Sequence, residues 1–189
     1  MKIILCLLVM VSLAFTSEPS QVDSLSHFLG VSISGFSGSG LTYKLYMNKN
    51  WSAKVAGYFY YDSEETGDVT SNVPDRVLYD IGLQMERNIL QNKSIRLYGL
   101  IGGKKYFSQY HDESSNIDKK VRIRYALGLG FGTELHAYDF PNLFNLILFA
   151  DVGENYYRLN RKNYYGDVKK SRDSYGFSFT GSMGIGIQF

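Results

Sequence analysis

Cysteine, proline and long apolar runs are all scarce in this chain of 189 residues. The single cysteine, Cys6, lies in the N-terminal apolar segment, which leaves no thiol elsewhere for a disulfide, a Cys-ligated metal site or a Cys nucleophile. Beyond that segment no apolar run approaches the roughly 18 residues that a membrane-spanning helix needs. A chain of this kind that spans a membrane must therefore do so as a closed β-barrel.

The chain also lacks an excess of one charge. Its 20 basic and 18 acidic residues give a net charge of +2, which provides no electrostatic reason to expect nucleic acid as a partner. By contrast, 19 glycines, 16 tyrosines and 12 phenylalanines stand against 3 prolines. This balance favours an aromatic-rich β protein.

The N-terminus has the pattern of a removable export signal. Lys2 gives a positive start, residues 3–13 form an apolar run too short to cross a bilayer, and small residues flank Ala14. We therefore expect a signal peptide over residues 1–14, with cleavage after Thr16 as the alternative. The predicted domain plan continues with a short periplasmic segment at 15–26 and one β domain at 27–189.

The last fifteen residues alternate between two kinds of side chain. One face carries Tyr175, Phe177, Phe179, Met183, Ile185, Ile187 and the terminal Phe189, with Gly181 among them. The other face is small and polar. This alternation predicts a strand with one side against hydrocarbon or a core and the other against a crowded, partly wet interior.

Seven further segments alternate in the same way, and together they predict eight strands. The expected ranges are His27–Phe36, Leu41–Met47, Trp51–Tyr61, Val77–Glu86, Ser94–Ser108, Ile123–Leu135, Leu146–Leu159 and Tyr175–Phe189. Short turns are expected at one end of these strands. Charged loops are expected at the other, over 62–76, 111–120 and 160–173, with only the first connection there, 37–40, short. The parity of the seventh strand stays open because Asp151 and Glu154 point oppositely, which a bulge or a position of Glu154 at the membrane edge would resolve.

Alternate positions of each strand face opposite sides of the sheet. When the strands are aligned on this basis, their charged residues fall on the face that carries the small residues. These residues are Lys44, Lys54, Asp80, Glu86, Arg96, Lys104, Arg124 and Glu134, and Asp151 joins them. A Lys or Arg on the lipid face near mid-bilayer costs roughly 2–4 kcal/mol, which explains such sorting. The prediction is an all-β, eight-stranded antiparallel transmembrane up-and-down barrel whose lumen is plugged by a network of charges and tyrosines. A soluble barrel would instead put its charges outside and its large aliphatic residues inside.

With these residues laid out, the chain from about His27 to Phe189 resembles the small OmpA/OmpX-like outer-membrane β-barrels, including the opacity and Ail-type adhesins. The resemblance implies a place in the outer membrane of a Gram-negative-type bacterium, among lipid and lipopolysaccharide. It also implies that the closing strand with its final Phe189 is the assembly signal for the barrel-assembly machinery and periplasmic chaperones. No adhesin-specific loop sequence is recognisable, so no individual activity follows.

Two candidate sites lie in the predicted loops. His111 is a weak candidate for the catalytic centre of a lipid A-modifying enzyme, and its neighbours in the sequence are Ser108, Asp112, Glu113 and Ser114. A basic external loop offers a surface for lipopolysaccharide phosphates or an extracellular ligand, and an acidic loop at 62–76 offers the opposite charge. The basic loop comprises Arg161, Lys162, Tyr164, Tyr165, Lys169, Lys170 and Arg172.

No cofactor and no metal site are expected. The leading hypothesis is a non-enzymatic outer-membrane barrel that serves surface contact, adhesion or lipopolysaccharide interaction and envelope integrity. A lipid A hydrolase or acyltransferase and a small pore are the alternatives.

Overall fold

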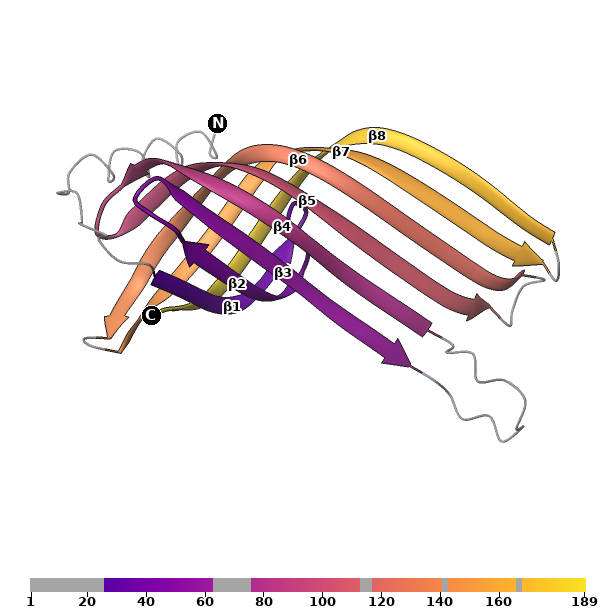
Figure 1. Cartoon of the computed structure of the whole chain (residues 1–189), viewed down its shortest axis with the longest axis horizontal. Helices are drawn as coiled ribbons and strands as arrows, with labels where there is room; N and C mark the ends of the chain where they lie inside the picture. Colours follow the sequence, from indigo (N-terminus) through magenta and orange to yellow (C-terminus); the bar gives the residue numbers. More distant parts are fainter. Residues whose placement is uncertain (1–25, 63–75, 113–116, 141–142, 166–167) are drawn as a thin grey trace, which may run out of the picture.

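The computed structural model describes residues 26–62, 76–112, 117–140, 143–165 and 168–189, and these form one closed barrel of eight strands (Figure 1). The strands are β1 (Ser26–Ser34), β2 (Gly40–Tyr46), β3 (Trp51–Asp62), β4 (Arg76–Gln91), β5 (Ile95–Asp112), β6 (Ile117–Phe140), β7 (Phe144–Tyr165) and β8 (Val168–Gln188). Each strand pairs antiparallel with the next, and β8 closes on β1. The predicted all-β, eight-stranded up-and-down barrel is therefore confirmed.

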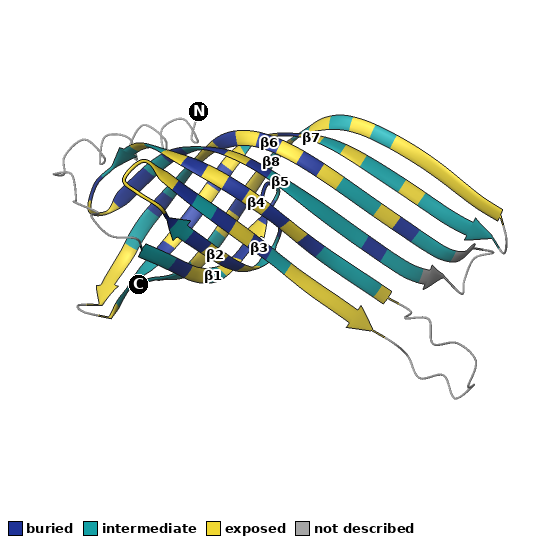
Figure 2. Ribbon diagram, in the orientation of Figure 1, coloured by how far each residue is buried: buried dark blue, intermediate teal, exposed yellow. Residues whose placement is uncertain are grey.

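Alternation of side chains decides which face of each strand is buried. On β4, Ile81 and Leu83 point outward and are 52% and 68% exposed, whereas Gln84 and Glu86 point inward and are 1% and 0% exposed. Figure 2 shows this banding most clearly in the part of the barrel beside β1 and β2. The barrel is thus apolar outside and polar inside, the reverse of a water-soluble fold.

Short turns join the strands at the end where the chain terminates. Asn48 folds one of them, because its Oδ1 accepts hydrogen bonds from the backbone N–H groups of Asn50 and Trp51 at 2.8 and 3.0 Å. Asn92 does the same for Ser94 and Ile95. The peptide groups of His27 and Phe189 exchange two hydrogen bonds of 2.9 Å, which close the wall at this rim.

The strands differ in length, and this divides the barrel into two parts. β1 pairs with β8 only over Ser182–Gln188, and β2 pairs with β3 only as far as Gly57. We call the part where all eight strands pair the closed ring. Beyond the β1–β2 turn, β3 to β8 continue as a curved sheet that we call the blade, and Figure 1 shows its strands running far past the short β1–β2 hairpin.

The first strand is shorter than the sequence predicts. It ends at Ser34 instead of Phe36 because the Ser34 hydroxyl accepts hydrogen bonds from the backbone N–H groups of Phe36 and Ser37, both at 3.0 Å. These bonds turn the chain into the lumen, where Phe36 is 1% exposed. The prediction that Phe36 belongs to the wall is wrong.

Two stretches predicted as loops are mostly strand. β7 and β8 stay in register up to the pair Tyr165–Val168, which leaves only residues 166–167 between them. Likewise β5 runs to Asp112 and β6 starts at Ile117. Polar side chains did not end the strands because each backbone still finds its partner across the ladder. The acidic stretch is different, since most of it, at 63–75, lies outside the described residues.

The parity of the seventh strand is settled by the same register. β7 pairs with β8 without a break from Asn145 to Tyr165, so it contains no bulge. Asp151 points inward and is 1% exposed, whereas Glu154 points outward between its cross-strand partners Leu129 and Phe179. Among the described residues, no helix is long and apolar enough to cross a membrane.

Candidate functional site

Six charged side chains meet inside the closed ring, three cations and three carboxylates. Lys44 contacts both Glu86, at 2.9 Å, and Glu134. Arg96 contacts the same two carboxylates, at 2.8 and 3.0 Å. Lys54 pairs with Asp151 at 3.1 Å. All six are at most 1% exposed, so each charge is removed from water and neutralised by its neighbours.

Neutral polar groups and rings fill the space around these ions. The Tyr46 hydroxyl donates to Glu134 at 3.1 Å, the Tyr98 hydroxyl donates to Asp151 at 2.6 Å, and Ser52 donates to Glu86 at 2.8 Å. The ammonium group of Lys54 lies 4.4 Å from the centre of the Phe149 ring. We call these residues together the ionic plug.

The β1–β2 turn adds a second layer above the ionic plug. Phe36 packs with Tyr98 and Leu100 in one buried cluster. Lys104 donates to the carbonyl of Ser34 at 2.9 Å, and Asn155 donates to the carbonyl of Gly35 at 2.6 Å. Gly38 takes a φ of 79° where a Cβ atom would lie 2.7 Å from the Ala56 carbonyl, so only glycine suits this approach.

The remaining predicted lumen charges lie higher, at the base of the blade. Lys104 contacts Asp80 at 3.3 Å. Arg124 has no carboxylate within ion-pair distance in the described ranges. Its guanidinium lies 4.6 Å from the Tyr157 ring, and its buried Nε finds no hydrogen-bond partner there. Eight of the nine predicted charges therefore pair by sign, and Arg124 does not.

The predicted basic loop is strand, and its residues divide between the two faces of the blade. By register, Arg161, Tyr165, Lys170 and Arg172 share the lumen-facing side with the inward residues below, whereas Lys162, Tyr164 and Lys169 face the other side. The loop prediction therefore groups residues that the strands separate.

Two residues of β6 complete the lumen-facing group, and the sequence analysis missed both. Lys120 and Arg122 line, with residues of β7 and β8, a hollow of about 300 Å³ that we call the basic trough. Its lining is Lys120, Arg122, Arg161, Asn163, Lys170, Ser171 and Arg172. The alternation of Arg122 and Arg124 with Ile123 and Tyr125 was the signal that could have found them.

The closing strand places its apolar residues outside, as alternation requires. Phe177 and Phe179 are each 77% exposed, and Met183 is 67% exposed. Phe189 stacks on His27 with 5.9 Å between ring centres. Recognition of this strand by assembly factors stays a prediction. His111 belongs to β5, but its side chain lies outside the described residues, as do Glu113 and residues 1–25.

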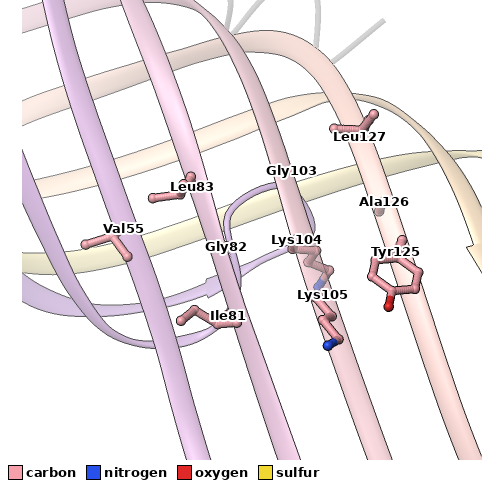
Figure 3. A pocket seen from close by; sticks show the side chains of 10 residues that line it. All are labelled: Val55, Ile81, Gly82, Leu83, Gly103, Lys104, Lys105, Tyr125, Ala126 and Leu127. Carbon is pink, nitrogen blue, oxygen red and sulfur yellow. The ribbon is translucent and has the colours of Figure 1, made fainter.

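The outer wall has a shallow groove where Gly103 lies between its cross-strand neighbours Leu83 and Leu127. Figure 3 shows the resulting groove, with the Lys105 ammonium and the Tyr125 hydroxyl at one end. The Lys105 ammonium lies 5.5 and 5.8 Å from the centres of the Tyr79 and Tyr125 rings. A cation held among tyrosines at the end of an apolar surface is typical of a membrane–water interface.

Within the described ranges, no group of three or more His, Cys, Asp or Glu side chains has the spacing of a metal site. No protein-family model matches the chain, and no curated protein matches it. Among solved structures, the chain is similar to a major outer membrane protein from Thermus thermophilus, with 15% identity, a TM-score of 0.46, and coverage of 88% of this chain and 98% of that one. A likeness at this level says nothing about function.

Proposed function

We propose that the protein is an integral outer-membrane β-barrel without enzymatic activity, sealed across its lumen, which displays the blade on the cell surface. The observation that carries this proposal is the inverted distribution of polarity. Large apolar residues cover the outside of the closed ring, while six paired ions occupy its centre. The finer resemblance to OmpA/OmpX-like barrels, opacity and Ail-type adhesins included, belongs to the same proposal.

The difference between the two rims of the barrel sets its orientation in the membrane in this proposal. Short turns and the terminal Phe189 lie at one rim, and the long strands β6 to β8 extend at the other. In outer-membrane barrels short turns face the periplasm and long elements face outward. The blade is then the external part, and its hairpins are the surface for contact with lipopolysaccharide or an extracellular ligand.

A sealed lumen favours an anchor over a pore. The ionic plug and the Phe36 layer occupy the interior of a barrel that, with eight strands, is only wide enough for side chains. Planar-bilayer recordings are expected to show no steady conductance. Stable single-channel steps would overturn the sealed-anchor proposal.

Membrane fractionation and gels test the proposal as a whole. The protein should appear in the outer-membrane fraction and should migrate differently before and after boiling, because a folded barrel binds less detergent than the unfolded chain. Recovery in the soluble periplasm with no shift on heating would refute it. For the absence of enzymatic activity, His111→Ala should leave the mass spectrum of lipid A unchanged compared with the parent chain.

A further inference from the structure

We infer that the basic trough binds the phosphate groups of a phosphorylated glycolipid from the surrounding outer leaflet. This inference rests on the proposed function for the place of the blade, and it names the partner of the blade's lumen-facing side. It is carried by three observations: a row of like charges, the absence of a neutralising carboxylate among the described residues, and the position of the row beside an open sheet edge.

The row consists of three arginines on adjacent strands. Arg122 of β6 pairs directly with Arg161 of β7, and Arg161 pairs directly with Arg172 of β8. The next rung on the same face brings Lys120, Asn163 and Lys170 together. Directly opposed residues have Cβ atoms about 4.5–5.5 Å apart, and like charges at this spacing repel. The Arg122 guanidinium donates to the Tyr110 hydroxyl at 3.1 Å, but this neutral partner does not remove the like-charge repulsion. The arrangement therefore favours the binding of an anion.

Among the described side chains, no carboxylate pairs with the three arginines of this row. The residues that line the trough are basic, amide or hydroxyl, with no Asp or Glu. Among the side chains that the structure describes, no carboxylate lies within ion-pair distance of Arg122, Arg161 or Arg172. The ion pair nearby, between Arg158 and Asp173 at 3.2 Å, lies on the opposite face. Three guanidinium groups in one row suit phosphate oxygens, which they bind in bidentate fashion.

A further arginine without a carboxylate partner among the described side chains, Arg124, lies below the row on the same face. Arg124 is two residues from Arg122, and its buried Nε has no hydrogen-bond partner among the described residues. Its guanidinium is instead held over the Tyr157 ring and reaches the Ser178 hydroxyl at 3.5 Å. Arg124 therefore adds a positive charge to the lumen-facing side just below the trough.

Position selects a lipid over a soluble anion. Arg122 lies three residues, about 10 Å along the strand, beyond Tyr125, whose ring lies beside the Lys105 ammonium on the outer wall. Headgroup phosphates occupy this level in a bilayer. Moreover, the β1–β8 pairing ends at Ser182, so the edge of β8 that carries Arg172 has no neighbouring strand among the described residues. A headgroup can therefore enter the trough sideways from the leaflet.

A pair of matched double variants tests the inference in purified, folded protein. Arg161→Gln with Arg172→Gln removes two charges from the trough. Lys162→Gln with Lys169→Gln removes two charges from the opposite face of the same strands. Binding is measured by thermophoresis with three probes: bisphosphorylated lipid A, lipid A stripped of both phosphates, and inorganic pyrophosphate. Heat-dependent gel mobility confirms that each variant is folded.

The trough variant should bind bisphosphorylated lipid A at least about tenfold more weakly than the parent chain, because each charge-assisted hydrogen bond contributes roughly a factor of ten. The control variant should change by less than about threefold, and dephosphorylated lipid A should bind the parent weakly. Equal losses in both double variants, or no loss in either, would overturn the inference. Pyrophosphate binding as tight as that of lipid A would also overturn it, in favour of a soluble anion. A folded, heat-shifting chain in the outer membrane that fails these tests refutes the trough alone and leaves the proposed function standing.

Discussion

Charged side chains are arranged in opposite ways in the closed ring and in the blade. In the ring, Lys44, Lys54 and Arg96 each contact a carboxylate, and all are nearly fully buried. In the blade, Arg122, Arg161 and Arg172 lie side by side, and no carboxylate among the described side chains contacts them. A buried charge must be paired inside the chain, because removal from water is expensive, whereas an exposed charge can be left for a partner. The charges of the ring are therefore neutralised within the chain, whereas the arginines of the blade are available to the phosphate groups that we propose as their partner.

The largest expected effect comes from breaking the balance of the ionic plug. Glu134→Gln leaves Lys44 and Arg96 sharing only Glu86, so one positive charge in the lumen loses its partner. Removing one member of a buried pair costs about 3–5 kcal/mol. Urea unfolding in lipid vesicles should show this loss of unfolding free energy. The same change at the outward Glu154 is the control, and an equal loss at both positions would contradict the role of the plug.

The charged residues of the ionic plug could be predicted from the sequence because side chains alternate strictly between the two faces of a strand. Parity alone placed Asp80, Glu86 and Glu134 on one face, and the closed ring put them together. The strands of the blade could not be predicted in the same way. Hydrophilic residues such as Arg161 and Lys170 suggested a loop, and only the ladder with its partners shows that they continue two strands. Which face each residue takes follows from register, which no local pattern contains.

The position of Phe36 shows a second limit of prediction from the sequence. It stands at the end of the first predicted strand, but hydrogen bonds to the Ser34 hydroxyl turn the chain before it. Local side chain–backbone bonds compete with ladder pairing, and serine is well suited to them. The buried position of Phe36 against Tyr98 and Leu100 then depends on contacts with β5, more than 60 residues away in the sequence.

The next largest effect should come from this aromatic layer. Phe36→Ala removes a ring that packs with Tyr98 and Leu100, and a buried Phe→Ala change costs about 3 kcal/mol. Unfolding in vesicles measures the loss. Phe59→Ala removes the same ring from a site that is 69% exposed on the outer wall, and it should cost clearly less. If the two variants lose equal stability, the turn does not stabilise the ring.

A smaller effect should appear when the repulsion in the blade is relieved. Arg161→Thr removes the middle charge of the arginine row and keeps a residue suited to strands. Amide hydrogen exchange in the β7–β8 hairpin should become slower than in the parent chain at low salt, and the difference should shrink at high salt because ions screen exposed charges. The outward Lys162→Thr is the control. Faster exchange in Arg161→Thr at low salt would show that the row does not strain the hairpin.

The smallest expected effect concerns the ion pair between Arg158 and Asp173 on the blade's outer face. The Asn160 side-chain amide donates to Asp173 at 2.6 Å and the Arg158 guanidinium donates to it at 3.2 Å, and these bonds hold the pKa of the Asp173 carboxyl below its usual value of 3.8. Because the pKa is lower in the folded chain, the contribution of this carboxylate to stability is present above pH 3.8 and is lost as the pH falls through the folded value. Carboxyl NMR titration of the detergent-solubilised protein should show the low pKa, and Asn160→Ala should raise it. Ser174→Ala, on the opposite face of β8, should leave it unchanged. If Asp173 titrated at its usual value in the parent chain, the bonds from Asn160 and Arg158 would not stabilise its charged form.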